Sequence, residues 1–336
     1  MSEVVVLLVL LTWWQDFQKP AQPYDVLEFY AGVGRIARVS KFIGLKSAAV
    51  DIEYGKASAS KRGSRPPMDI NSDAGLLLCI RLLLCSENPA AFFAIVCSSW
   101  VPVNRGSTMR DILTPLGNED YPAVRRSNKM TSRTVILMLI AVVSGGVFFM
   151  EQPMNSLVAM HPRYIWLVEL LLQLDIPTYK VAFWMRKYAS LSWKRTWVWS
   201  SSRVIQALDL GPMTPEERSN SETLTTRYRD GSGAKRFKGN KSLKKSQHYT
   251  YKFAAKVVSV IPEARSAARA PELSTQVSSE SLLTLFENMP WCDESKRWDE
   301  EADLRDVIRY ARGSRRLSIP EGWRAVLPTT IPPQEF

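Results

Sequence analysis

Short apolar segments alternate with longer amphipathic segments between residue 24 and about residue 260. The apolar segments have the length of strands, which we predict at residues 26–29, 47–50, 92–96 and 147–150. Two more strands are predicted at 179–184 and 196–200, as an antiparallel pair. This alternation is typical of an α/β fold, in which helices cover a doubly wound, mostly parallel sheet. The antiparallel pair is expected to close that sheet.

The segments between the predicted strands have the apolar spacing of helices. One helix is expected to end near Phe42, and others are predicted at 74–84, 123–143, 161–174 and 249–260. His161 precedes Pro162, and we interpret it as a helix-start residue in preference to a catalytic residue. Residues 55–67 and 98–121 are predicted to be long polar loops.

The pattern divides the chain into three parts. Residues 1–23 are expected to form an apolar N-terminal extension, and its apolar run from Val4 to Trp14 is too short to span a bilayer because a spanning helix needs ~20 residues. It lacks a positive start and a clear cleavage site, so we expect a buried or docking helix. Residues 24–260 form the α/β domain, and residues 261–336 form a linker and a charged tail. No membrane partner is expected.

Charge and cysteine content narrow the possible functions. The formal net charge of +11 favours an anionic partner, most often nucleic acid. Four cysteines without a CxxC pair and two histidines disfavour a disulfide scaffold, a structural zinc site and Ser-His-Asp chemistry. We expect an intracellular protein, nuclear or cytoplasmic and not secreted, because free cysteines suit a reducing compartment.

The most informative local motif runs from Glu28 to Gly34, as E-F-Y-A-G-V-G after the first predicted strand. Small residues there let the backbone approach a ligand closely. Gly32 to Ala37 also fits GxGxxA, the phosphate-binding turn of a dinucleotide fold. However, Glu28 would repel a pyrophosphate, whereas it suits the sulfonium and ammonium groups of S-adenosylmethionine. The motif therefore favours the methyl donor as cofactor.

Further candidate residues follow the next predicted strands. Asp51 ends the second strand and could hold ribose hydroxyls, and Asp69 follows a third short apolar step and could accept from the adenine amine. Cys97 and Glu151 come after two buried strands, where a thiol and a carboxyl suit nucleophilic catalysis with acid assistance. Because ligands bind at the carboxyl ends of parallel strands, we expect these residues to share one edge of the sheet.

The order of these motifs resembles that of the C5-cytosine DNA methyltransferases. E-F-Y-A-G-V-G is similar to the family's D-L-F-A-G-I-G, and M-D-I at 68–70 to its G-D-I. C-S-S-W at 97–100 stands where the family has P-C-Q-x-F, and E-Q-P at 151–153 where it has E-N-V. Y-A-S at 188–190 with K-R-T at 194–196 resembles its Y-G-x-P-Q-x-R-x-R segment, and Y-T-Y-K-F-A at 249–254 its closing helix.

The resemblance covers about residues 24–260 and implies a class I methyltransferase fold that is Rossmann-like. It implies that S-adenosylmethionine binds to Glu28, Tyr30, Gly32, Gly34, Asp51 and Asp69. It further implies that Cys97 attacks C6 of a flipped-out cytosine while Glu151 contacts N3. Val96 and Ser98 replace the Pro and Gln that flank the family's cysteine, so both an active and a weakened or inactive enzyme remain open.

A basic region lies late in the predicted domain. Residues 227–252 contain nine Lys or Arg and one acid, with aromatic residues between them, and Gly231, Gly233 and Gly239 predict a flexible loop. We predict that this short insert, 204–247, binds nucleic acid through phosphates, with DNA favoured over RNA. The candidate contacts are Arg195, Lys235, Arg236, Lys238, Lys244 and Lys245.

The sequence thus predicts an S-adenosylmethionine-dependent methyltransferase that acts on cytosine in DNA. Two alternatives remain open. One is a non-catalytic protein that binds nucleic acid on the same fold, and the other is an NAD(P)-dependent oxidoreductase built on GxGxxA.

Overall fold

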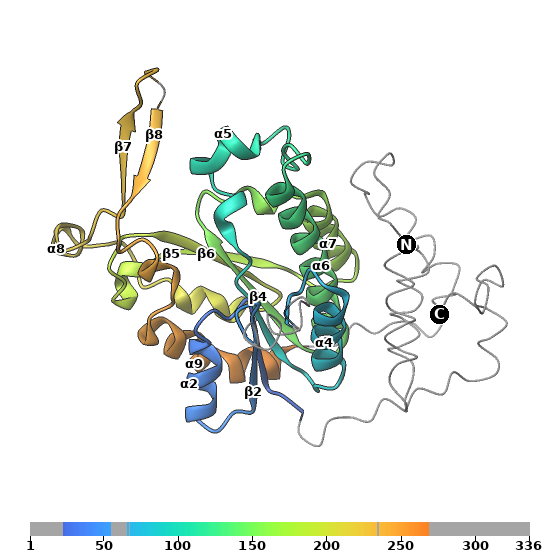
Figure 1. Cartoon of the computed structure of the whole chain (residues 1–336). Coiled ribbons are helices and arrows are strands. Elements are labelled where there is room, and N and C mark those ends of the chain that lie inside the picture. Colours follow the sequence, from blue (N-terminus) through green and yellow to red (C-terminus); the bar gives the residue numbers. More distant parts are fainter. Residues whose placement is uncertain (1–22, 55–65, 67, 234, 269–336) are drawn as a thin grey trace, which may run out of the picture.

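The computed structural model describes residues 23–54, 66, 68–233 and 235–268, and within these a six-stranded sheet forms the centre (Figure 1). The strand order is β2-β1-β3-β4-β6-β5. The strands are β1 (Val26–Phe29), β2 (Ser47–Val50), β3 (Ala90–Phe93), β4 (Val147–Pro153), β5 (Tyr179–Trp184) and β6 (Arg195–Ser200). β1 pairs in parallel with β2 and with β3, and β3 pairs in parallel with β4. β6 is antiparallel to both β4 and β5. The predicted α/β class, with a mostly parallel sheet and an antiparallel pair, is confirmed.

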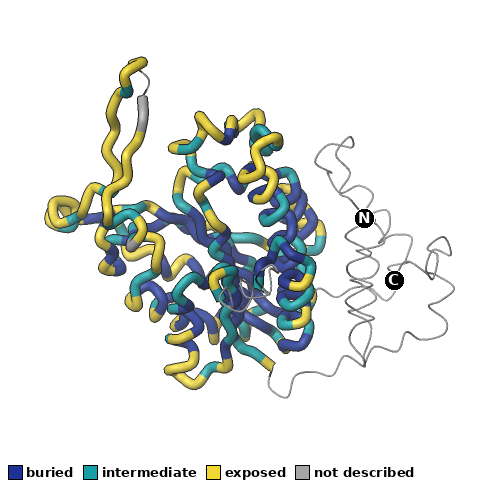
Figure 2. Tube along the Cα trace, viewed as in Figure 1, coloured by how far each residue is buried: buried dark blue, intermediate teal, exposed yellow. Residues whose placement is uncertain are grey.

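Helices cover both faces of the sheet, and Figure 1 shows them as two layers. α4 (Asp73–Leu84), α6 (Pro122–Val143) and α7 (Pro162–Gln173) pack on one face, and α2 (Arg35–Phe42) and α9 (Tyr251–Ala267) on the other. Alternate residues of each strand enter opposite cores, which is why the strands read as continuous apolar runs. For example, Phe93 stacks on Phe29 with ring centroids 4.8 Å apart, while Phe92 packs in the other core. Figure 2 shows the buried centre between exposed outer helix faces.

Short helices occupy the connections. α5 (Arg105–Thr108) and the 3-10 helices η1 (Cys97–Ser99) and η2 (Pro102–Asn104) replace part of the predicted loop 98–121. The others are η3 (Leu157–Met160), η4 (Met185–Tyr188), η5 (Arg203–Leu208), α8 (Pro215–Ser219) and η6 (Lys245–Gln247). The His161 side chain caps α7 by accepting a hydrogen bond from the Arg163 amide at 3.2 Å, which confirms its predicted role as a helix-start residue.

Three predicted boundaries were wrong. β3 ends at Phe93 rather than at residue 96, because the chain turns and leaves Val96 exposed. β4 continues to Pro153 rather than ending at residue 150, so Glu151 lies within the strand and not after it. α9 continues to Ala267, where the sequence predicted a helix end at residue 260 and a linker from residue 261. Pro262 lies inside this helix, and the burial of Val258 and Ile261 around it outweighs the missing hydrogen bond.

The end of α9 is tied to the start of the sheet. The Arg265 guanidinium forms an ion pair with Asp25 at 2.8 Å and donates to the Asn88 carbonyl at 2.8 Å. The Asn88 side chain returns a hydrogen bond to the Arg265 carbonyl, also at 2.8 Å. This clasp joins the segments before β1 and β3 to the last helix of the domain.

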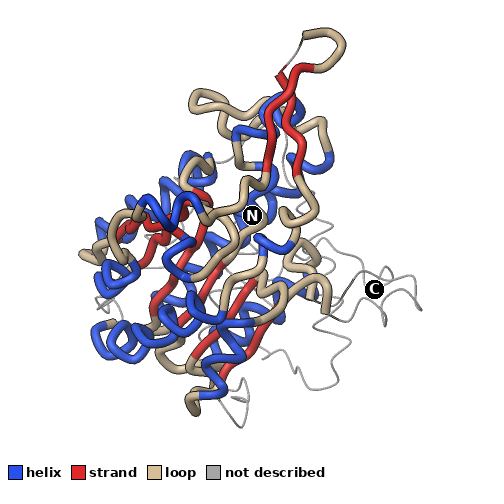
Figure 3. The backbone as a smooth tube through the Cα atoms, turned by 90° about the vertical axis from the view of Figure 1, so that its left-hand side faces the viewer, coloured by secondary structure: helices blue, strands red, loops and turns tan. Residues whose placement is uncertain are grey.

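The basic insert contains a β-hairpin where a loop was expected. β7 (Thr225–Arg229) pairs antiparallel with β8 (Lys235–Gly239), and the hairpin projects from the body of the molecule (Figures 1 and 3). Among the described residues, none of the helices combines the length and apolarity needed to cross a membrane. The predictions for the apolar extension up to residue 22, for loop residues 55–65 and 67 and for the tail after residue 268 lie outside the described residues.

Candidate functional site

The loop between β1 and α2, residues 30–34, has the backbone conformation of a ligand-binding turn, and we call it the glycine loop. Gly32 and Gly34 have φ values of +54° and +66°, which favour glycine, and Gly34 is the residue before α2. A Cβ atom built on Gly32 would meet nothing within 4 Å, so open space lies beside this backbone. Tyr30, which also has a positive φ, donates or accepts a 2.7 Å hydrogen bond with the Thr134 hydroxyl. The loop can therefore admit a ligand close to its main chain.

Glu28 lies on β1 directly below this loop and is 1% exposed. Its Oε2 accepts a 2.8 Å hydrogen bond from the Ala37 amide in the first turn of α2. Its Oε1 is buried without a hydrogen-bond partner. Burial raises the pKa of this carboxyl to about 7, against the opposing effect of the α2 amides. One oxygen thus holds the helix, and the other remains to be satisfied.

Replacing Glu28 with glutamine should remove a pH dependence of stability. A carboxyl whose pKa is higher in the folded than in the unfolded state stabilises the fold while protonated, and this contribution is lost as the pH rises from about 4.5 to about 7. The unfolding free energy of the wild type relative to Glu28→Gln should fall by roughly 3 kcal/mol over that range. Urea unfolding at both ends of the range measures this, and a constant difference would contradict it.

Asp51 joins the end of β2 to the glycine loop. Its Oδ2 accepts a 2.7 Å hydrogen bond from the Gly32 amide, and its Oδ1 accepts a 2.8 Å bond from the Glu53 amide. The side chain is half-buried, so its remaining lone pairs can meet a ligand. Asp51 also interacts electrostatically with Glu28, so side chains from β1, the glycine loop and the end of β2 lie together here.

Asp69 reaches the same region by a different route. The sequence suggested that Asp69 follows a strand, but it lies in the turn before α4. The carboxylate accepts a 3.0 Å hydrogen bond from the Asn71 amide, and Arg126 approaches it at 3.7 Å. Asp69 interacts electrostatically with Tyr30, so the turn lies near the glycine loop although no strand delivers it.

Cys97 begins η1, four residues after β3, and is half-buried. β3 lies between β1 and β4, so the segment that follows it emerges beside both the glycine loop and Glu151. Burial raises the pKa of the Cys97 thiol, whereas nearby Lys194 acts to lower it and Glu151 to raise it. The structure therefore brings Cys97 and Glu151 together, as the sequence predicted.

Glu151 lies within β4 and binds two groups that sequence reasoning did not select. The Lys194 ammonium approaches its Oε1 at 3.3 Å, and the Tyr249 hydroxyl donates to its Oε2 at 2.8 Å. Lys194 precedes β6, and the antiparallel pairing of β6 with β4 brings it to this edge. Tyr249 is placed by Arg35, whose guanidinium donates to its carbonyl, and by edge-to-face packing on Phe92.

The segment that carries Cys97 is braced by buried polar contacts. Gln152, next to Glu151, donates a 2.6 Å hydrogen bond to the Ile95 carbonyl and accepts one from Ser156 at 2.8 Å. The Arg110 guanidinium lies 3.6 Å from the ring centre of Trp100 and donates to the Ser99 hydroxyl. Because Trp100, Arg110 and Gln152 are at most 1% exposed, the segment that carries the thiol is held by a fixed frame rather than by a loose loop.

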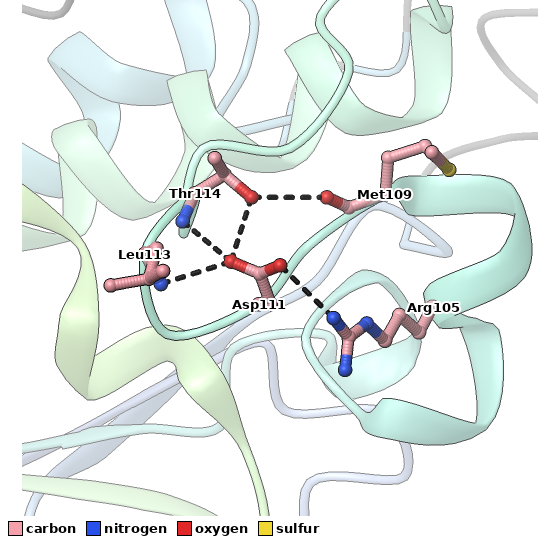
Figure 4. A network of polar contacts seen from close by, with 5 residues as sticks. All are labelled: Arg105, Met109, Asp111, Leu113 and Thr114. Atoms are coloured by element: carbon pink, nitrogen blue, oxygen red, sulfur yellow. Dashed lines mark hydrogen bonds and ion pairs between the residues drawn. The ribbon is translucent and has the colours of Figure 1, made fainter.

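The loop beyond α5 is also ordered by a single carboxylate. Asp111 accepts hydrogen bonds from the Leu113 amide and from both the amide and hydroxyl of Thr114, and it forms a 3.0 Å ion pair with Arg105 (Figure 4). The Thr114 hydroxyl bond contributes most to keeping the pKa of Asp111 below its usual value. The loop presents two apolar side chains to solvent, Ile112 at 71% and Leu113 at 91% exposure.

The predicted nucleic-acid contacts gather outside the sheet, except for Arg195. Lys235, Arg236 and Lys238 lie on β8, and Lys244 and Lys245 follow at η6. Lys238 and Lys244 are exposed, and Arg227 stacks over the exposed Phe237 ring at 5.3 Å. Arg195 begins β6, where its exposed guanidinium lies 5.3 Å from the Trp184 ring centre. Five of the six contacts therefore lie on the projecting hairpin or at its base, and Arg195 lies next to Lys194.

Comparison with protein-family models and with curated proteins finds no match to this chain. Among the described residues, no group of three or more His, Cys, Asp and Glu side chains could hold a metal ion. The function must therefore be argued from the geometry of the site itself.

Proposed function

We propose that this protein is an S-adenosylmethionine-dependent methyltransferase that acts on C5 of cytosine in DNA. The observation that carries the proposal is the cluster of Cys97, Glu151 and Lys194 at the same sheet edge as the glycine loop. A nucleophile, a carboxyl and a cofactor loop at one edge are what methyl transfer to an unreactive ring carbon requires. The order of the sequence motifs supports the same reading.

The strand arrangement supports a class I methyltransferase fold over a dinucleotide-binding one. Dinucleotide folds have the parallel order 3-2-1-4-5-6, without a reversed strand between the last two. In this chain β6 runs antiparallel between β4 and β5, as expected from the resemblance. Buried Glu28 below the glycine loop is a second argument, because an acid there opposes a pyrophosphate. The oxidoreductase alternative is thus disfavoured.

The residues present fit S-adenosylmethionine. The open space beside Gly32 admits a ligand, and Glu28 Oε1 is a buried acceptor without a partner that suits a positive group. Asp51 would hold ribose hydroxyls from the end of β2, and Asp69 with Tyr30 would border the adenine. The cofactor supplies the methyl group that C5 receives.

The protein's own residues would divide the chemistry at the base. Cys97 Sγ adds to C6 of cytosine as the C5–C6 π bond breaks, which makes C5 electron-rich enough to take the methyl group. Loss of the C5 proton to solvent and expulsion of the Cys97 thiolate from C6 then restore the ring and the enzyme. The Glu151 carboxyl contacts N3 and relays a proton to it, which neutralises the negative charge that attack places on the ring, and it takes the proton back when the ring is restored. Cytosine must leave the DNA stack to reach this buried edge, and the general solution is to flip the base.

The hairpin supports nucleic acid as the partner. Its exposed face carries Lys and Arg with Tyr228 and Phe237 between them, a combination that neutralises phosphates and can stack on bases. A two-stranded ribbon by itself is marginally stable, so an anionic partner along it would also order it. We favour DNA over RNA, in the nucleus or cytoplasm, on the resemblance alone.

Replacing Gly32 with valine should abolish S-adenosylmethionine binding, because the side chain would fill the space beside the loop. Gly44→Val is the matched control, since Gly44 also has a positive φ and open surroundings but lies before β2, away from the rim. Calorimetry with S-adenosylmethionine, its demethylated product and NAD measures both variants. Tight NAD binding without binding of the methyl donor would refute the proposal.

A second candidate is a non-catalytic protein that binds nucleic acid on the same fold. It is favoured by one observation, namely that burial raises the pKa of Cys97 and so disfavours the reactive thiolate. The hairpin and the cysteine are also separate features, so nucleic-acid binding could persist without chemistry. Cofactor and DNA binding without methyl transfer would select this candidate.

A further inference from the structure

The surroundings of Cys97 contain a cation that the proposed reaction has not yet used. Lys194 comes from the segment before β6, Glu151 from β4 and Tyr249 from the segment before α9, and all three interact electrostatically with the thiol. Glu28 on β1 also acts on Tyr249 from below. Three separate chain segments thus set the charge around one sulfur atom.

Contacts on both sides of Glu151 hold Lys194 in place. The carboxylate is 7% exposed, with Lys194 on Oε1 and Tyr249 on Oε2, so it cannot turn away from the lysine without losing both. Lys194 is 30% exposed, which means that most of its side chain is packed and does not reach into solvent. An ammonium has three N–H donors, and the Glu151 contact uses one of them.

We propose that Lys194 activates Cys97 by stabilising its thiolate. The S–H bond breaks heterolytically, the proton passes to water or a buffer base, and the electron pair stays on Sγ beside the Lys194 ammonium. Lys194 acts through Cys97 and need not touch the substrate. The proposal rests on the proposed function in one respect, because it takes Cys97 as the nucleophile.

The signs of the electrostatic effects agree with this geometry. Burial raises the pKa of Cys97, Lys194 lowers it, and Glu151 raises it. Desolvation by itself would lower the pKa of Lys194, but the Glu151 carboxylate and the Cys97 thiol raise it above its usual value. Lys194 therefore keeps its positive charge at neutral pH.

Alkylation of Cys97 tests the proposal on the full-length protein without DNA or cofactor. Thiolate attack on iodoacetamide displaces iodide, and mass spectrometry of the Cys97 peptide separates this thiol from the other three. In Lys194→Met, alkylation near pH 8 should be about tenfold slower, and its pH profile should shift upward by about one pH unit. Lys194→Arg should retain most of the wild-type rate, because it keeps the charge.

Two further variants make the outcome decisive. Glu151→Gln should shift the profile the other way, to lower pH, because it removes a negative charge and leaves Lys194 in place. Lys187→Met is the matched control, since Lys187 pairs with Glu217 at 2.9 Å and should leave the profile unchanged. A Lys194→Met profile that superimposes on the wild type, or shifts of equal sign in Lys194→Met and Glu151→Gln, would overturn the proposal. If the alkylation profiles shift as expected but the wild type transfers no methyl group to DNA, the proposed function is refuted and the role of Lys194 is not.

Discussion

Replacing Cys97 with serine should abolish a covalent complex between this protein and DNA that contains 5-fluorocytosine. In cytosine the hydrogen at C5 leaves as a proton, whereas fluorine cannot leave as a cation. The bond from Sγ to C6 therefore persists in the wild type and can be seen as a shifted band on a denaturing gel. Serine has the same shape but is a far weaker nucleophile, and methyl transfer should fall by at least about 10⁴-fold. The structure motivates this change because Cys97 shares its sheet edge with the glycine loop and Glu151.

Cys79→Ser is the matched control for this experiment. Cys79 is a buried residue of α4 in the apolar core, and its replacement should leave the covalent complex in place. Glu151→Gln should slow formation of the complex without abolishing it, because the thiol remains. If no complex forms with any DNA although S-adenosylmethionine binds, the non-catalytic candidate is the better description.

Removing the charges of the hairpin and its base should weaken DNA binding strongly at low salt. Each duplex phosphate neutralised contributes about −0.9 to the slope of log affinity against log salt. Five such contacts should make the DNA affinity of the wild type fall approximately 500-fold between 50 and 200 mM salt. The five replacements are Lys235→Ala, Arg236→Ala, Lys238→Ala, Lys244→Ala and Lys245→Ala. Fluorescence anisotropy with a labelled duplex at several salt concentrations measures the slope, which should become much shallower in this variant.

The control for the hairpin experiment removes exposed positive charge from another part of the fold. Arg38, Lys41 and Lys46 lie on or just after α2 and are exposed, so their replacement by alanine lowers the net charge without touching the hairpin. This variant should retain nearly the wild-type slope. Equal slopes in the hairpin variant and the wild type would exclude the hairpin as the contact surface.

The sheet could be predicted from sequence because both of its faces are buried. Val26 to Phe29 and Val147 to Met150 are continuous apolar runs, and such runs have few interpretations in a chain with helical spacing between them. Strand ends were harder to predict. Ala94 and Ile95 are as apolar as the β3 residues, and the turn after Phe93 depends on the neighbouring strands.

The cluster around Glu151 could be predicted only in part. Cys97 and Glu151 follow adjacent apolar runs, so their proximity follows from a parallel sheet. Lys194 and Tyr249 are 43 and 98 residues from Glu151, and their positions depend on the antiparallel insertion of β6 and on the packing of α9. A signal for Lys194 existed, because it immediately precedes the last strand of the sheet.

The hairpin illustrates the opposite difficulty. Its glycines indicated a flexible loop, although Thr225, Tyr228 and Phe237 favour strands and Asp230-Gly231 favours a turn between them. Strand propensity was the available signal, but the glycines among the Lys and Arg residues led to the interpretation as a loop. Composition therefore identified the chemistry of this region but not its shape.

The clasp between Arg265 and Asp25 has a consequence for how the chain folds during synthesis. It connects residues 240 positions apart, and α9 covers the sheet face that carries Phe92 and Phe149. Until the ribosome has released α9, that face stays open to solvent and β1 lacks its anchor. A nascent chain that ends before residue 251 should therefore present a sticky apolar sheet to chaperones, and the domain should reach its native state only after its last helix emerges.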